Sequence, residues 1–493
     1  MDIKSTSQSA VARPEDENLG VGANIAYGFQ HVLTMYGGII AVPLIVGQAA
    51  GLLPAEIGLL IAASLFIGGI ATLLQTIGVP FFGCQLPLVQ GVSFASVATV
   101  VAIVTTGGGL PSVFGAVIAA SALGFLITPI FSQIIKFFPP LVTGTVITTI
   151  GLTLMPVAAR WAMGGNSNLP TFGSMTNIGL AGFTLAMVLL LSKLGNAAIS
   201  RLSILLAMVI GTFVAWALGL VDFSGITTGS IFALPTPFHF GMPTFEIAAI
   251  ISMFIVVLVI LVETSADILA VGDIIETDID SKRLGNGLRA DMAASMIAPI
   301  FGSFTQSAFA QNVGLVAVTG VKSRFVVAYA GIILVVLGLM PIMGRVIATV
   351  PTAVLGGAGI VLFGTVAASG IRTLAQVSYT NNMNLIIVAT SIGFGMLPIA
   401  APAFYDQFPD WFATIFHSGI SSAAIMAIAL NLLFNHLKIG NSDQQSVFVA
   451  GTEDRSVRPV VMVDLYEGDY FTEGKLFDCD GKEIPVSKEP AQH

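Results

Sequence analysis

The stretch TQSAFAQNVGLVAVTG, from Thr305 to Gly320, is short and polar, yet it lies between long apolar runs. An earlier stretch, FFGCQLPLVQGVSFAS from Phe81 to Ser96, has the same character. Each breaks the apolar pattern near the middle of a segment. Non-helical backbone is tolerated at membrane depth only where protein encloses it or where it lines a cavity. The two stretches therefore predict two interrupted membrane segments.

The composition of the whole chain is that of a membrane protein. Of its 493 residues, 55% are hydrophobic and only 9% are charged, and the mean hydropathy is +0.92. Soluble domains carry about 25% charged residues. Apolar runs of about 20 residues, each able to cross roughly 30 Å of hydrocarbon, recur along the chain. We therefore expect an all-α polytopic membrane protein.

The apolar runs between Gly, Pro and charged residues predict fourteen transmembrane segments. The third and the tenth are the interrupted ones. The predicted segments are 24–46, 58–79, 86–105, 111–135, 140–158, 176–193, 202–221, 245–271, 288–303, 307–320, 325–343, 350–368, 383–398 and 413–435.

The distribution of Lys and Arg predicts the orientation of these segments. With the N-terminus in the cytoplasm, nine basic residues lie in cytoplasmic loops, and only Arg160 and Arg345 lie outside. This asymmetry is what the positive-inside rule expects, so both termini are predicted to be cytoplasmic. The nine are Lys136, Lys193, Arg201, Lys282, Arg283, Arg289, Lys322, Arg324 and Arg372.

A weak internal similarity predicts an inverted repeat. FPPLVTGTVITTIG, from Phe138, resembles VPTAVLGGAGIVLFG, from Val350. These stretches open the fifth and twelfth segments, and the interrupted segments, third and tenth, are also seven apart. Since seven is odd, the two halves of a 7+7 repeat insert in opposite senses. A pair of broken segments at equivalent positions points to a binding site near the middle of the membrane.

The remaining features exclude several classes of protein. The polar stretch Met1–Leu19 lacks the regions of a cleaved signal peptide, so we expect insertion through the chain's own spans with the N-terminal tail kept. Cys84 and Cys479 form neither a disulfide framework nor a metal motif. No basic patch suggests a nucleic-acid partner, and nothing predicts a cofactor. From Lys438 the chain is polar and is expected to be a soluble tail with a short hairpin.

Ionisable side chains inside the apolar segments are candidates for function, because burying them in a membrane is costly. Glu263 and Asp267 lie four residues apart in the eighth segment and thus on one helix face. They could support hydrogen bonds between helices; we favour the alternative, that Glu263 binds substrate and Asp267 or a neighbour handles a proton. Asp291 opens the predicted ninth segment, where a helix N-terminus would suit an acid. Gln30 and His31 lie in the first segment, and His31 is predicted either to orient other groups or to handle a proton.

The two interrupted segments supply polar groups for a ligand. Gln311 and Asn312 are adjacent amides, and Gly314 would allow close backbone approach. Ser93 and Phe94 place a small hydroxyl beside an aromatic ring. An acid, an amide and a ring to stack on are the set that a planar heterocycle with N–H and C=O edges requires.

These motifs together resemble those of the nucleobase–ascorbate transporter family. Its signature resembles the run from Gln311 through Asn312, Gly314 and Thr319 to Gly320, and the Gln30-His31 pair and the Glu263/Asp267 spacing are also similar to the family's. The resemblance covers the chain from about Asn24 to Asn435. Four motifs in the expected order make it specific.

The resemblance implies a fold and a division of the chain. Segments three and ten would be short strands joined to half-helices. A core domain would comprise residues 24–135 and 245–343, and a gate domain 136–221 and 344–436, with tails 1–23 and 437–493. The resemblance also implies a homodimer in a bacterial inner membrane, in which the core moves past the gate like an elevator.

It further implies roles for residues. Glu263 and Gln311 would bind a base, Phe94 would stack on it, Asp291 and Asn312 would support the site, and His31 and Asp267 would shape affinity or proton coupling. Gln311 resembles the purine carriers rather than the uracil carriers. Ser93 favours carriers of xanthine and urate together, whereas Gly320 is similar to xanthine-selective carriers, so the preferred purine stays open.

Two other classes remain as alternatives. An anion exchanger of the same architecture would need a cation at the broken helices, and segments three, eight and ten contain none. A membrane-embedded enzyme using Glu263 and Asp267 as acid and base would need a nucleophile, metal or cofactor beside them, and the sequence supplies none.

Overall fold

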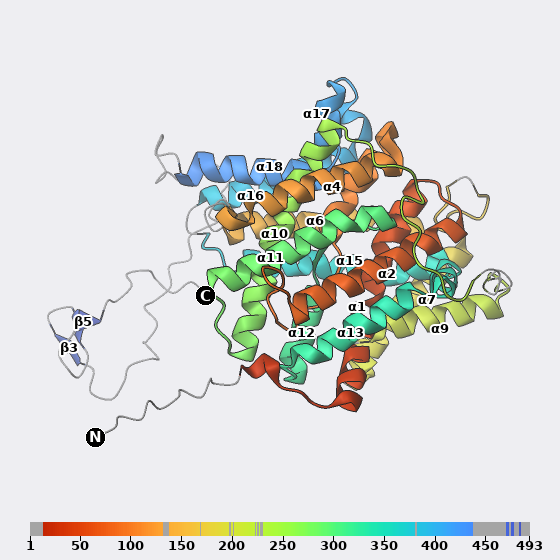
Figure 1. The fold of residues 1–493 in the computed structure, drawn as a ribbon. Helices are drawn as coiled ribbons and strands as arrows, with labels where there is room; N and C mark the ends of the chain where they lie inside the picture. The colour runs from red at the N-terminus through yellow and green to blue at the C-terminus, as the bar shows by residue number, and fades with distance from the viewer. Residues whose placement is uncertain are drawn as a thin grey trace. The chain divides into compact units, whose positions relative to one another are not determined.

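The computed structural model describes residues 13–131, 138–167, 169–196, 199–200, 202–221, 223, 226, 230–379 and 382–436, and three short strands beyond them. The chain divides into two units. One consists of Met1–Tyr379 with Asn384–Ile439, and the other of Thr380–Met383 with Gly440–His493. The first contains the membrane segments (Figure 1).

In the first half of the chain, helices and one short strand follow the predicted segments in order. They are α1 (Val21–Ala49), α2 (Pro54–Ile77), β1 (Gln90–Val92), α3 (Val97–Ile103), α4 (Gly109–Ile127), α6 (Pro140–Ala162), α7 (Met175–Leu194) and α9 (Ser203–Ala217).

The second half repeats this order with its own strand. Its elements are α10 (Ile247–Ile275), α11 (Ser281–Ile297), β2 (Gln306–Ala308), α12 (Ala310–Thr319), α13 (Arg324–Gly338), α14 (Pro341–Ala348), α15 (Thr352–Leu374), α16 (Asn382–Ala400), α17 (Asp410–Phe416) and α18 (Gly419–Asn431). Each of the fourteen predicted segments coincides with a helix, a pair of helices or a strand joined to a half-helix. The predicted fold class is confirmed.

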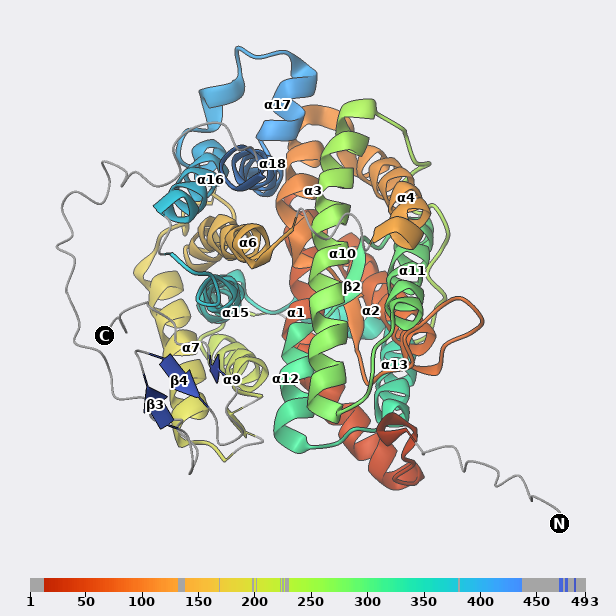
Figure 2. The ribbon, with the colours of Figure 1, turned by 90° about the vertical axis from the view of Figure 1, so that its left-hand side faces the viewer.

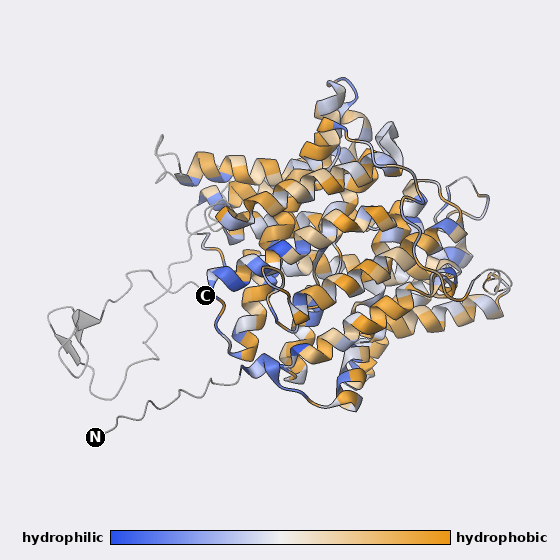
Figure 3. Cartoon of the chain, viewed as in Figure 1, coloured by the Kyte–Doolittle hydropathy of each residue, from blue (hydrophilic) through white to orange (hydrophobic). Residues whose placement is uncertain are grey.

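Most of these helices are apolar along their length. Within the described residues, eight are long and apolar enough to cross a membrane, and the bent pair α13–α14 would make a ninth. Apolar residues cover most of the helical surface in Figure 3, and hydrophilic ones gather at helix ends and in loops. The chain is therefore a multi-pass membrane protein.

The two interrupted segments meet through their strands. β1 and β2 pair antiparallel, with Gln90 opposite Ala308 and Val92 opposite Gln306. The pairing continues through bonds from Phe309 N to Val89 O at 3.1 Å and from Ser93 N to Thr305 O at 2.9 Å. All six strand residues are buried. Each strand thus satisfies the other's backbone where no water is available.

The similar fifth and twelfth segments also lie against each other, as α6 and α15. Pro139 and Pro351 precede the two helices as their N-caps. Near one end, a Cβ at Gly370 would collide with the backbone of Thr148, and near the other a Cβ at Gly356 would collide with Ala162. The helices are therefore antiparallel and in backbone contact. Both equivalent pairs, β1–β2 and α6–α15, are related as an inverted repeat requires.

The helices form two sets. In Figure 2, α6, α7, α9, α15 and α16 lie on one side of α10, and α2, α4, α11 and α13 on the other. On the side of α6, helix α15 packs on α6 and α7. On the other side, α13 packs on α2, and α4 packs on α11. We call the elements α1–α4 and α10–α13 the first helix set, and α6, α7, α9, α15, α16 and α18 the second helix set.

Three segments differ from the prediction in ways that have a clear physical cause. The ninth segment, expected from residue 288, begins at Ser281, where Asp280 caps the helix through a bond from Arg283 N. Hydropathy missed these turns because SKRLGNGLRAD is polar. The eleventh segment bends by 79° between α13 and α14, since Gly338 ends one helix and Pro341 starts the next. The fourteenth is divided between α17 and α18.

The second unit contains a small antiparallel sheet. Strand β3 (Tyr470–Thr472) pairs with β4 (Lys475–Phe477), which pairs with β5 (Glu483–Ile484). The short hairpin predicted for the tail is therefore confirmed. The remainder of the predicted tail, like residues 1–12, lies outside the described residues.

Candidate functional site

The strand pair positions the start of a helix on each side. β1 leads through a 3-10 turn (Phe94–Ser96) into α3, and β2 leads through Phe309 into α12. The ring centroids of Phe94 and Phe309 lie 6.4 Å apart. The ring centroid of Phe94 also lies 6.2 Å from that of Phe363 in α15. Phe94 is therefore at the boundary between the two helix sets.

Close packing of α1 against these rings requires a glycine. A Cβ at Gly38 would lie 2.8 Å from the ring of Phe309 and 3.5 Å from that of Phe94. Any larger residue would move one of the rings, so Gly38 fixes the position of the aromatic pair relative to α1.

Asn312 connects the second half-helix to α1. Its Nδ2 donates to Nδ1 of His31 at 3.0 Å and to the His31 carbonyl at 3.1 Å. Both side chains are buried, and Asn312 Oδ1 has no hydrogen-bond partner among the described residues. Because Nδ1 accepts, the ring proton resides on Nε2. His31 thus orients the signature segment.

Asp291 lies well inside α11 and not at a helix N-terminus, so that expectation was wrong. Its Oδ1 accepts from Gln75 Nε2 at 3.1 Å, and its Oδ2 accepts from Thr264 Oγ1 at 2.6 Å. The Thr264 hydroxyl oxygen in turn accepts from Ala308 N of β2 at 3.3 Å. Asp291 therefore connects α2, α10 and β2, and the helix dipole does not explain its position.

Glu263 and Gln311 are two side chains near the strand pair that have hydrogen-bonding capacity to spare. Both are half-buried, and neither has a hydrogen-bond partner within the described residues. Glu263 precedes Thr264, which contacts β2, and Gln311 is in the first turn of α12. Each is thus next to the strand pair. A buried carboxyl or amide without a partner is costly, so these positions suit a ligand that supplies one.

Asp267 lies one turn along α10 from Glu263. It is buried, and its Oδ2 has no partner among the described residues. The carboxyl of Asp291 in α11 accepts from Thr264, the residue that follows Glu263. Three acids are therefore gathered around one turn of α10.

Ser93 performs a local structural task. It is buried, and its Oγ accepts from Ala95 N at 3.2 Å as the N-cap of the turn that precedes α3. Its carbonyl accepts from Ser96 Oγ at 3.0 Å. A serine oxygen retains a second lone pair and its own proton, so capping leaves it able to meet a ligand.

The other signature residues do not meet at this point. Thr319 Oγ1 donates to Leu315 O at 2.8 Å within α12, and Gly320 ends that helix with φ of +67°. A Cβ at Gly314 would have no described atom within 4 Å, so the space beside its backbone is open. Gln30 is half-buried, and its carbonyl accepts from Thr34.

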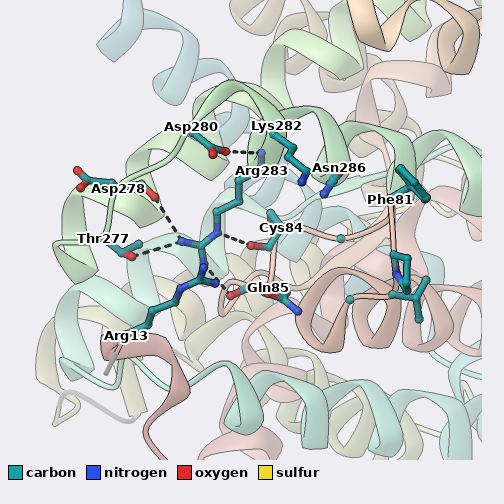
Figure 4. Close-up of a pocket in the computed structure, with 14 residues that line it drawn as sticks. Arg13, Phe81, Cys84, Gln85, Thr277, Asp278, Asp280, Lys282, Arg283 and Asn286 are labelled. Atoms are coloured by element: carbon teal, nitrogen blue, oxygen red, sulfur yellow. Dashed lines mark hydrogen bonds between the residues drawn. The ribbon is translucent and has the colours of Figure 1, made fainter. Parts of the chain in front are cut away.

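Two cavities lie elsewhere. One of about 420 Å³ is between the helix sets, lined by residues of α3, α6 and α16, together with His417. Another, of about 830 Å³, is at the ends of α2 and α11 and is lined by Arg13, Lys282 and Arg283 (Figure 4). Among the described residues, no group of His, Cys, Asp and Glu could hold a metal ion.

Sequence reasoning missed Gln75, Thr264 and Phe309. Gln75 and Thr264 are uncharged, and in an apolar segment ionisable groups give the strongest signal. An amide such as Gln75 within an apolar segment is a signal that could have been used, because it also needs a buried partner. Thr264 gave no signal of its own, since threonines in apolar helices often bond their own backbone.

Comparison with known proteins identifies the family. The model of a family described as "Permease family" matches residues 22–404. The chain is 41% identical to the uric acid transporter UacT of Escherichia coli K12 over 441 residues, covering 88% of this chain and 91% of that protein. This chain belongs to the nucleobase–ascorbate transporter family.

Further members of the family are similar over most of their length. The chain is 39% identical to a xanthine permease of Bacillus subtilis strain 168, covering 84% of this chain and 94% of that protein. It is 33% identical to the xanthine permease XanP of Escherichia coli K12, covering 82% of this chain and 90% of that protein. These relatives are transporters and not enzymes, so the alternative of a membrane-embedded enzyme is rejected.

Solved structures show that other transporters share the fold of this nucleobase–ascorbate transporter. The transmembrane domain of the cyanobacterial bicarbonate transporter BicA matches with a TM-score of 0.54 and 15% identity, covering 84% of this chain and 98% of that domain. The anion transporter Slc26a9 of mouse matches with a TM-score of 0.58 and 13% identity, covering 85% of this chain and 69% of that protein. At such identities the likeness concerns the fold alone.

Proposed function

We propose that the chain is a proton-coupled symporter that imports purine bases, xanthine and/or urate, across a bacterial inner membrane. The observation that supports this best is the pair Glu263 and Gln311. Both lie beside the crossing of β1 and β2 without a hydrogen-bond partner among the described residues. A purine base would give each of them one.

The chemistry of the surrounding groups fits a planar base. The Glu263 carboxylate would accept from ring N–H groups, and the Gln311 amide would both donate and accept. No side chain caps the start of α12. Its free backbone N–H groups, which carry partial positive charge, would meet a purine carbonyl oxygen. The half-exposed ring of Phe94 would stack on the base.

The relatives narrow the substrate to purines. Those named for uric acid and xanthine are 33–41% identical to this chain. Of the alternatives, a uracil carrier fits Gln311 less well. An anion exchanger shares the fold, but segments three, eight and ten contain no cationic residue to hold an inorganic anion.

The two helix sets would act as the core and gate domains of an elevator. The core would comprise residues 24–135 and 245–343, and the gate 136–221 and 344–436. Glu263, Gln311 and Ser93 are all in the first helix set, and Phe94 meets Phe363 of the second at 6.2 Å. A site built almost wholly on one set could move past the other without being taken apart. The tails 1–23 and 437–493 would face the cytoplasm, and the carrier would work as a homodimer.

Counterflow in proteoliposomes tests the substrate. Vesicles loaded with unlabelled xanthine should accumulate labelled xanthine transiently, and chromatography should recover it unchanged. Competition by urate, hypoxanthine, guanine and uracil gives the order of preference, in which we expect xanthine and urate first. Counterflow of bicarbonate or sulfate without purine counterflow would contradict the proposal.

The coupling ion needs a separate experiment. Asp267, Glu263 and His31 are available as proton sites, so accumulation in energised cells should collapse with a protonophore and persist without sodium. A strict requirement for sodium would exclude proton coupling.

A further inference from the structure

The segment before α1 is bound to the ends of the membrane helices. Its 3-10 turn (Pro14–Asp16) places Glu15 in a fully buried position. The Glu15 carboxylate forms an ion pair with the guanidinium of Arg283, at the start of α11. Thr277 Oγ1 also donates to it, at 3.4 Å. We call residues 13–18 the N-terminal strap.

Arg283 holds the loop that leads into β1. Its Nε donates to the carbonyl of Cys84 at 2.6 Å, and an Nη donates to the carbonyl of Gln85 at 3.0 Å (Figure 4). The loop needs such support because Phe81 and Gln85 have left-handed backbone, with φ of 72° and 55°. One guanidinium thus connects the strap with the loop.

Gln75 of α2 forms a hydrogen bond with the same loop, through the backbone nitrogen of Cys84. Its Oε1 accepts from Cys84 N at 3.1 Å, and its Nε2 donates to Asp291 at 3.1 Å and to Gly287 O at 3.2 Å. Asp291 is bonded to Thr264, and Thr264 to Ala308 of β2. An unbroken series of hydrogen bonds therefore runs from Glu15 through Arg283, Cys84, Gln75, Asp291 and Thr264 to β2, which we call the relay.

We propose that Gln75 and Arg283 are positioning residues of the binding site, and that the N-terminal strap holds them in place through Glu15. Removing the Glu15 charge leaves Arg283 without its ion pair, which loosens the Cys84–Gln85 loop and with it the contact of Gln75 with Asp291. The strand β2 and the neighbouring Glu263 then lose their fixed geometry. The expected effect on purine binding rests on the proposed function, whereas the hydrogen-bonded connection between the strap and β2 does not.

The strap has a second anchor that provides a matched control. Asp16 accepts from Arg324 Nε at 2.6 Å, and Arg324 also donates to the carbonyls of Thr76 and Ile77 at 2.9 and 3.0 Å. This ion pair ends on the carbonyls of Thr76 and Ile77, next to Gln75, but among the described residues Arg324 has no hydrogen bond to a member of the relay. Glu15→Gln and Asp16→Asn therefore remove equal charge from the same segment, but only the first cuts the relay.

Cys84 is a probe placed within the relay. The thiol is fully buried, and burial raises its pKa to about 12. In the folded protein it should react slowly with maleimide, since the thiolate is the reactive form. The experiment uses the full-length chain with Cys479→Ser, so that Cys84 is the single thiol. The loss of a charged hydrogen bond should raise its labelling rate by about tenfold in Glu15→Gln and leave it unchanged in Asp16→Asn.

A second measurement extends to the binding site. The KM for purine uptake should rise several-fold in Glu15→Gln and in Gln75→Met, with the maximal rate per molecule much less affected, while Asp16→Asn keeps the parental KM. Coupling between two sites is reciprocal. Saturating purine should therefore slow Cys84 labelling in the parent but not in Gln75→Met, a difference that a purely structural role for Gln75 would not produce.

The possible outcomes test the strap, the positioning residues and the proposed function separately. Equal labelling in Glu15→Gln and Asp16→Asn would overturn the strap's role, and faster labelling with unchanged KM would overturn the positioning role. If the Glu15→Gln labelling rises selectively in a chain whose parent transports no purine, the relay stands and the proposed function fails.

Discussion

The hydroxyl oxygens of Thr99 in α3 and Ser418 at the start of α18 lie 2.6 Å apart, although 319 residues separate them in the chain. Ser421 of α18 extends the contact to Ser252 of α10, with their hydroxyl oxygens 3.3 Å apart. All four residues are fully buried. This hydroxyl cluster joins the first helix set to the second, so any sliding of one set past the other must break it.

Thr99→Val should favour separation of the two sets, since it removes the hydroxyl while keeping the shape. A neutral hydrogen bond contributes about 0.5–1.5 kcal/mol, which predicts about 2- to 10-fold faster maleimide labelling of a cysteine placed at Thr105, in the cavity between the sets. Thr145→Val is the control, because the equally buried Thr145 hydroxyl bonds only to Leu141 of its own helix. Equal labelling in both variants would show that the cluster does not restrain the sets.

Glu263→Gln should nearly abolish purine uptake without loss of protein from the membrane. The amide keeps the volume but cannot accept from two ring N–H groups as a carboxylate does. The loss of a charged hydrogen bond of about 1.5–3 kcal/mol predicts a fall in kcat/KM of about 10-fold or more. Glu246→Gln is the control, because Glu246 is the exposed N-cap residue of α10, more than four turns from Glu263. Uptake by Glu263→Gln at the parental rate would refute the substrate role.

Ser93→Asn should reduce affinity for urate far more than for xanthine. Asparagine is as good an N-cap as serine, so the turn before α3 stays capped while the side chain grows toward the C8 edge of the purine. A clash of this kind changes selectivity by about 10- to 200-fold. Inhibition constants for both purines in parent, Ser93→Asn and Ser93→Ala separate steric from capping effects. If the urate-to-xanthine ratio moves less than about twofold in Ser93→Asn, the side chain does not face C8.

Gly370→Ala should destabilise the protein, because the added methyl would collide with the backbone nitrogen of Thr148 in α6. Overpacking of this kind costs about 1–3 kcal/mol. Gly364→Ala on the same helix is the control, since its Cβ would meet only the Met155 side chain, at 3.6 Å. The midpoint of thermal aggregation in detergent should fall for Gly370→Ala alone. A fall of equal size in both variants would contradict close backbone contact at Gly370.

The sequence was sufficient for the fold because the membrane imposes a strong pattern. Apolar runs and their interruptions gave fourteen segments, and the two polar stretches predicted where the backbone would leave the helix. Asp291 shows the limit of this reasoning. Hydropathy began its helix at residue 288, whereas the polar turns from Ser281 are helical and Asp280 caps them. Asp291 was assigned to a helix end, but it lies inside the helix and accepts hydrogen bonds from Gln75 and Thr264.

The connections between residues far apart in the chain could not be read from the sequence. His31 and Asn312 were each recognised, but their hydrogen bond depends on how α1 crosses α12. Glu15 was placed in a tail without assigned chemistry, and only the fold brings it to Arg283. Such contacts follow from the relative placement of helices, which periodicity does not encode.

The pairing of β1 with β2 has a consequence for how the protein is made. Gln90 finds its partner in Ala308, which the ribosome adds 218 residues later. At 5–20 residues per second this is a delay of about 10–40 s. During that time the strand and its half-helix have unpaired backbone groups, which are costly in lipid. The first half of the chain would therefore depend on a protected environment during synthesis, such as the insertion machinery, until the second half arrives.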